Sequence, residues 1–186
     1  MSRVKLDEVV LDRRLCDVLR TMRGLTAIDE IHVTVLGRIH ELLVTTPEGY
    51  HSSVIEFATG ILKTPVLRAD IAAAARTALG MTYARMDDAR LDDAMVNLLQ
   101  GFEGARDVTG DDYNVELIAA AGLELVVVYG AMGDFGRAWQ ALSEVDKELR
   151  TARLDHSTAT ALAREVERAR KTVMDLQAAY SRASAA

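Results

Sequence analysis

Four aspartates, Asp87, Asp88, Asp92 and Asp93, form the densest group of side chains in this sequence that could do chemistry. Carboxylate oxygens ligate divalent cations, so one hypothesis is a small all-helical enzyme that uses these aspartates and a metal ion. The same residues flank the start of an expected helix at Leu91, where the helix dipole favours negative charge. We prefer this structural interpretation, and we predict no metal, no cofactor and no catalytic residue.

The other residue types that commonly take part in catalysis lack the necessary spacing. None of the four histidines has the i, i+4 spacing of a zinc-binding helix, and the lone Cys16 cannot complete a thiolate site. The sequence contains neither a Gly-x-Ser-x-Gly elbow nor a phosphate-binding loop. A single cysteine also forms no intrachain disulfide, which fits a reducing cytoplasm. We therefore predict a non-enzymatic, cytoplasmic protein.

A glycine-rich segment offers a competing interpretation. Gly130, Gly133 and Gly136 follow the β-branched run Leu125–Tyr129, which gives the outline of a strand, a turn and a helix at a dinucleotide site. The dinucleotide fingerprint places glycines at its first, third and sixth positions, whereas here they occupy the first, fourth and seventh. We expect a helix instead; a β-ladder over residues 123–129 would favour a nucleotide-handling enzyme.

Basic residues near the start of the sequence allow a DNA-linked regulator as a further hypothesis. Arg13, Arg14, Arg20 and Arg23 lie on an expected helix over residues 6–23. The helix expected next is mostly apolar where a recognition helix is polar, and the chain carries a net charge of −6. Nucleic-acid binding requires concentrated positive charge, so we do not expect it.

The overall composition is that of one globular domain without a membrane segment. The 186 residues are 49% hydrophobic and 27% charged. The first eight residues lack the apolar core of a signal peptide. The longest apolar run, residues 117–132, contains Glu124 and is too short to span a bilayer.

Helix-forming residues dominate the chain, which has only two prolines. Capping residues and apolar seams predict eight helices joined by short connections, over residues 6–23, 26–46, 50–62, 67–86, 91–106, 112–132, 134–153 and 157–180. Asp134 is the expected cap of the seventh helix, and Ser157 or Thr158 that of the eighth. We predict an all-α single domain over residues 1–186: N-terminal helices in 1–66, two helical hairpins in 67–153, and a capping helix with a tail in 154–186.

In one segment Leu79-Gly80 and Tyr83 precede Ala94, and in another Tyr129 precedes Gly133-Asp134-Phe135 and Ala138. These two segments resemble the tetratricopeptide repeat, in which an aromatic wedge and small contact residues hold two antiparallel helices together. The tyrosines of the two units are 46 positions apart instead of 34, so the helices must be longer, as in the helical sensor modules of some bacterial regulators. The resemblance implies a right-handed stack of antiparallel hairpins. The residues implied in repeat packing are Leu79, Gly80, Tyr83, Ala94, Tyr129, Gly133, Phe135 and Ala138.

The resemblance also implies a concave groove lined by the first helix of each hairpin. The groove lacks the basic and asparagine side chains that grip a peptide carboxylate, so we exclude an acidic C-terminal peptide as its ligand. An amphipathic or apolar peptide could fill it, or the chain's own terminal helices could. We favour the latter because, within the helix over 112–132, residues 119–132 are apolar or glycine on all sides apart from Glu124, which we expect to pair with Arg85 or another neighbour. The groove positions are Ala74, Thr77, Met81, Arg85, Leu123 and Val127.

The last helix has an apolar seam with a 3.5-residue period. One interpretation is a C-terminal capping helix that covers the last repeat. The alternative is a homodimer interface. The seam consists of Leu162, Val166, Ala169, Val173 and Leu176. Together these patterns predict an adaptor or regulatory sensor that binds a peptide, a protein partner or a second copy of itself.

Overall fold

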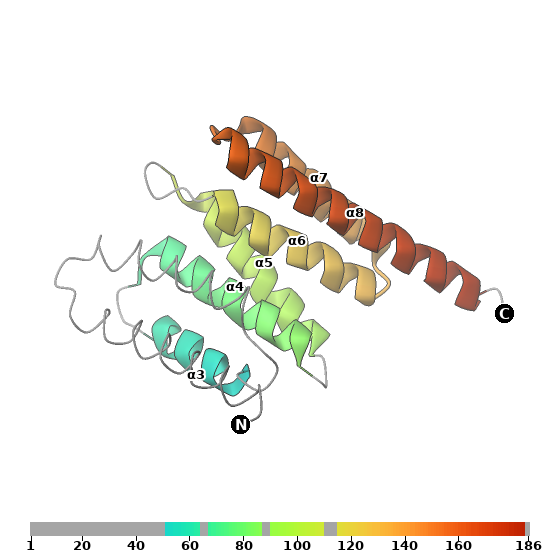
Figure 1. Cartoon of the computed structure of the whole chain (residues 1–186). Helices are drawn as coiled ribbons and strands as arrows, with labels where there is room; N and C mark the ends of the chain where they lie inside the picture. The colour runs from blue at the N-terminus through green and yellow to red at the C-terminus, as the bar shows by residue number, and fades with distance from the viewer. Residues whose placement is uncertain (1–50, 64–66, 87–89, 110–114, 185–186) are drawn as a thin grey trace, which may run out of the picture.

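The computed structural model describes residues 51–63, 67–86, 90–109 and 115–184, and the secondary structure of this part is exclusively helical (Figure 1). The expected helices over residues 6–23 and 26–46 lie outside the described residues. The all-α prediction is therefore confirmed for the described part of the chain. Its six helices are α3 (His51–Leu62), α4 (Ala69–Arg85), α5 (Leu91–Asp107), α6 (Val115–Ala131), α7 (Phe135–Thr151) and α8 (His156–Ser184).

The helices form two layers in which neighbours along the chain are neighbours in space. Helices α4, α6 and α8 lie nearer the viewer in Figure 1, and α5 and α7 lie behind them. Each helix packs against the next, and α6 additionally contacts α4 and α8. Helix α3 packs beside α4.

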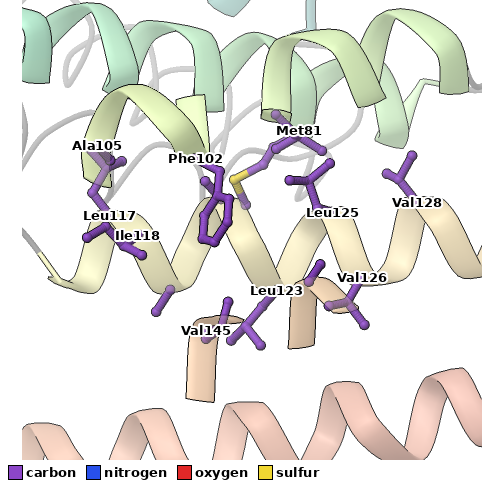
Figure 2. Close-up of a cluster of buried hydrophobic side chains, with 14 of the residues drawn as sticks. Met81, Phe102, Ala105, Leu117, Ile118, Leu123, Leu125, Val126, Val128 and Val145 are labelled. Atoms are coloured by element: carbon purple, nitrogen blue, oxygen red, sulfur yellow. The ribbon is translucent and has the colours of Figure 1, made fainter. Parts of the chain in front are cut away.

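Helix α6 is the centre of the core. Twelve of its 17 residues are buried, which confirms the prediction that an all-round apolar helix is central. Figure 2 shows its side chains meeting Met81 of α4 and Phe102 of α5 on one side and Val145 of α7 on another. Residues 125–129 belong to this helix, so the strand required by the dinucleotide interpretation does not exist.

Glycines allow the helices to cross at short range. A Cβ atom at Gly80 of α4 would overlap the Leu98 side chain and would lie 2.9 Å from the Ala94 carbonyl oxygen of α5. A Cβ atom at Gly101 would lie 3.0 Å from the Thr77 nitrogen. Because backbone atoms cannot move aside as side chains do, larger residues at these positions would push α4 and α5 apart.

The turn between α6 and α7 has the predicted chemistry. Gly133 has a φ of 78°, in the left-handed region that favours glycine. Asp134 precedes α7, and its carboxylate accepts a hydrogen bond of 3.1 Å from the Arg137 amide. The expected Gly-Asp turn with an aspartate cap is confirmed.

The cap of α8 differs from the prediction. Ser157 and Thr158 were the expected caps, but Asp155 Oδ1 accepts hydrogen bonds from their two backbone amides, at 2.9 and 3.0 Å. Both hydroxyl groups also donate to the Asp155 carboxylate. A carboxylate outcompetes a hydroxyl as acceptor here because it takes all four bonds at once.

Helix α8 covers α6 and α7 with its apolar seam. Leu162, Val166, Ala169 and Val173 are buried in the chain's own core, and Leu176 is half-buried against Gly130 of α6. The seam side chains therefore pack against helices of the same chain. Among the described helices, none combines the length and the apolarity needed to cross a bilayer.

Candidate functional site

The six residues expected to line a concave groove occupy two different environments. Ala74, Thr77, Met81 and Leu123 are buried in the core, and the Thr77 hydroxyl donates to the Ala73 carbonyl oxygen at 2.9 Å. The other two, Arg85 and Val127, are exposed. Most of the implied groove is thus filled by the chain's own helices.

Arg85 and Glu124 form the predicted ion pair between α4 and α6. The guanidinium Nη2 and the carboxylate Oε2 are 3.1 Å apart. Burial raises the pKa of the Glu124 carboxyl above its ordinary value, and the Arg85 charge partly opposes this shift. The pair closes the exposed edge of the α4–α6 contact.

The aspartates at the start of α5 lie where the helix dipole favours them, and one of them has a structural partner. Asp92 and Asp93 lie in the first turn of the helix, and Asp93 pairs with Arg90 at 2.6 Å. The Arg90 guanidinium also lies 4.6 Å from the centre of the Tyr83 ring. Within the described ranges, no group of three or more histidine, cysteine or acidic side chains could hold a metal ion. Two of the four aspartates (87 and 88) and the N-terminal arginines lie outside the described residues.

A cleft opens on the other layer, between α5 and α7 and above α6. Its volume is about 390 Å³. Helix α5 and helix α7 form its walls, and α6 contributes two residues between them. The lining residues are Leu99, Phe102, Glu103, Arg106, Leu125, Tyr129, Arg137, Gln140, Ala141 and Glu144.

The inner part of the cleft is apolar and well packed. Phe102, Leu125 and Tyr129 are all less than 7% exposed, and Ala141 is also buried. Leu99, at the outer edge of the α5 wall, is 37% exposed. An apolar floor beneath a partly exposed aliphatic wall provides a surface from which a ligand's side chain can displace water.

Arg106 ties the two walls together at one end of the cleft. Its guanidinium bonds Glu144 at 2.8 Å and Glu148 at 3.0 Å, both on α7. It also lies 5.2 Å from the centre of the Phe102 ring, within cation–π distance. These three contacts hold Arg106 in place between two carboxylates.

Arg137 marks the other end of the cleft. Its guanidinium lies 5.9 Å from the centre of the Tyr129 ring and pairs with Asp134 at 3.3 Å. Burial raises the pKa of the Tyr129 phenol, with smaller effects in the same direction from Asp134 and Glu103 and an opposing effect from Arg137. The phenol therefore keeps its proton at neutral pH and remains a hydrogen-bond donor.

Glu103 is the one charged residue of the cleft lining without an ion pair in the described part of the chain. It is exposed on α5, one helical turn beyond Leu99. Two carboxylates, those of Glu103 and Glu144, and two guanidinium groups, those of Arg106 and Arg137, line the cleft. Glu148 and Asp134 pair with these guanidinium groups from outside the lining. Both lining arginines are thus matched by carboxylates, and Glu103 remains as a negative charge without an ion pair among the described residues.

The residues implied in repeat packing lie where helices meet. Tyr83 and Phe135 are half-buried, and Phe135 makes an edge-to-face contact with Tyr180 of α8 at 5.8 Å. Gly80 and Gly133 lie at the α4–α5 crossing and in the α6–α7 turn, as described above. The remaining four are buried: Leu79, Ala94, Tyr129 and Ala138.

The sequence interpretation missed the cleft except for one residue, Tyr129, which it assigned to packing. Arg106 and Glu144 are 38 positions apart, and no local pattern indicates that they meet. The available indication was a pair of aliphatic side chains, Val96 and Leu99, on the face of the expected helix that also carries Glu103.

Comparison with known proteins assigns no relative. No family model matches the sequence, and neither the curated proteins nor the solved structures contain a significant match. The geometry by itself defines, for the described residues, a two-layer arrangement of helices with a cleft on the α5–α7 face, whose lining includes one carboxylate, Glu103, without an ion pair there.

Proposed function

We propose that this protein is a non-enzymatic interaction module with tetratricopeptide-like hairpins, which binds a segment of a protein partner in the cleft between α5 and α7. The alternation of the helices between two layers supports the repeat assignment. Two further features support it: the close approach of the helices at Gly80 and the Gly133-Asp134 turn. In the repeat, too, small residues let the paired helices pack closely and a tight turn joins them. The residues 69–107 and 115–151 are the two proposed hairpins.

The cleft itself is the observation on which the binding function rests. Ligand sites are typically apolar hollows with a few polar groups at their edge, of about 300–1,000 Å³. At about 390 Å³, this cleft accommodates one or two side chains of a peptide. The proposed site therefore lies on the α5–α7 layer and not on the α4–α6 face that the repeat pattern indicated.

This arrangement suits an adaptor or a regulatory sensor. Its walls are helices held together by Arg106 and by the α6 core, so the site is largely formed before a partner arrives. A preformed site reduces the entropy that binding must offset. We propose that the protein acts in the cytoplasm and recruits a partner without changing it chemically.

Covering the cleft tests the proposal. Gln140 is exposed and lines the cleft from α7, whereas Gln100 is exposed on α5 outside the lining. Peptides selected from a displayed library on the wild-type protein should lose at least about tenfold in affinity for Gln140→Trp, a change of about 1.4 kcal/mol. The matched variant Gln100→Trp should bind them within twofold of wild type. Circular dichroism establishes that both variants are folded.

Two outcomes would overturn the proposal. Selected peptides that bind Gln140→Trp as tightly as wild type would place the site elsewhere on the molecule. A library that yields no peptide able to distinguish Gln140→Trp from Gln100→Trp would also contradict binding in the cleft.

A further inference from the structure

We infer that the segment bound in the cleft is an amphipathic helix that carries lysine or arginine beside its apolar face. This inference rests on the proposed function and adds the chemistry of the partner. It is drawn from the charge of the rim, the aliphatic stripe on α5 and the kind of backbone that the site can accept.

The rim charges favour a cation. Arg106 is already held by two carboxylates of α7, and Arg137 by Asp134. Glu103 has no ion pair among the described residues and stands exposed on the opposite wall. A lysine or arginine of a partner meets an available carboxylate here, whereas an acidic or phosphorylated partner meets Glu103 as a negative charge that no ion pair offsets.

An aliphatic stripe on α5 leads into the cleft. Val96 is 47% exposed and Leu99 is 37% exposed, and both lie on the same face because they are three residues apart. Glu103 follows one turn after Leu99 on the same face. The stripe therefore presents two apolar contacts and then a negative charge along one line, which matches apolar and basic residues spaced along a partner helix.

The secondary structure of the partner segment is inferred by excluding the modes of peptide recognition that this site cannot support. Addition of a β-strand needs an exposed sheet edge, and the described ranges contain no strand. Recognition of a proline-rich segment needs exposed aromatic faces, yet Phe102 and Tyr129 are both buried. An amphipathic helix that inserts one or two apolar side chains between α5 and α7 agrees with the volume of the cleft.

The experiment uses the full chain and three synthetic helical peptides of equal length. All three have the same leucine face, and their opposite face carries lysine, glutamine or glutamate. The protein variants are Glu103→Lys and, as a matched control of the same net charge, Glu165→Lys on the exposed face of α8. Affinities are measured by isothermal titration calorimetry at about 50 mM and about 150 mM salt, because screening by salt weakens interactions between exposed charges.

The expected result is tightest binding of the lysine peptide to wild type. Glu103→Lys should weaken it about tenfold at the lower salt concentration, and Glu165→Lys less than twofold. Glu103→Lys should also bind the glutamate peptide more tightly than wild type does. Equal losses in the two charge variants would overturn the inference, because the attraction would then follow net charge alone.

The outcomes separate this inference from the proposed function. If the glutamine or glutamate peptide binds wild type at least as tightly as the lysine peptide, and Gln140→Trp blocks that binding, the preference for a basic partner is wrong while the cleft remains a binding site. If Gln140→Trp leaves the binding of every peptide unchanged, both fail.

Discussion

Replacing Gly80 by alanine measures how closely α4 and α5 approach each other. The added Cβ atom would overlap the Leu98 side chain and would lie 2.9 Å from both the Ala94 carbonyl oxygen and the Leu98 nitrogen. Ordinary contacts begin at 3.4 Å, so α5 must move by about 0.5 Å.

The expected change is a loss of stability. Overpacking a core costs about 1–3 kcal/mol, and alanine regains about 1 kcal/mol over glycine within a helix. Gly80→Ala should therefore lower the free energy of unfolding by up to about 2 kcal/mol. Gly60 on α3 is the matched control, because a Cβ atom there meets nothing within 4 Å. Gly60→Ala should raise the free energy of unfolding by about 0.5–1 kcal/mol.

Urea unfolding followed by circular dichroism and by the fluorescence of Trp139, the only tryptophan, gives both values. Opposite signs for the two glycines support the close crossing. A stabilising effect of Gly80→Ala equal to that of Gly60→Ala would refute it.

Three further variants test the electrostatics. Glu124→Gln should raise the stability by less than about 1 kcal/mol at pH 7. Because burial raises the pKa of Glu124 in the folded state, the wild type loses stability as the pH rises above the ordinary value of 4.5, so the difference should vanish below that pH in thermal melts. Asp155→Ala should lower the melting temperature at pH 7, because hydrogen bonds hold the pKa of this carboxyl well below 3.8 and its contribution to stability persists above that pH. The difference in melting temperature from the wild type should shrink as the pH falls below 3.8. Asp155→Asn should retain most of the stability that the cap contributes. Arg106→Ala removes two ion pairs with α7 and should cost about 1–2 kcal/mol in urea unfolding, with a smaller loss at 1 M salt; a salt-independent loss would indicate packing alone.

The helices could be predicted from the sequence because their determinants are local. Asp134 and Gly133 specify the α6–α7 turn by themselves, and the predicted start of α5 at Leu91 agrees with the structure. The predicted cap of α8 was wrong because three residues within four positions can each cap a helix: Asp155, Ser157 and Thr158. Only the competition among their acceptors decides which one is used.

The candidate site could not be predicted because its determinants are distant in sequence. The repeat pattern indicates which helices form hairpins, but it does not specify how tightly the small residues of α4 let α5 and α6 close over Thr77 and Met81. That closure removes most of the implied groove. Likewise, the contact of Arg106 with α7 depends on the crossing at Gly122, where a Cβ atom would overlap Val145 and would lie 2.8 Å from the Phe102 ring.

Methyl NMR of the full chain during titration with the leucine–lysine helix tests the central claim most directly. The proposed docking predicts saturable shifts of the Leu99, Leu125 and Ala141 methyl signals in the cleft, with the signals of Val127 on the other layer unchanged. Shifts confined to Val127, or no saturable shift in the cleft, would contradict the claim that the partner binds between α5 and α7.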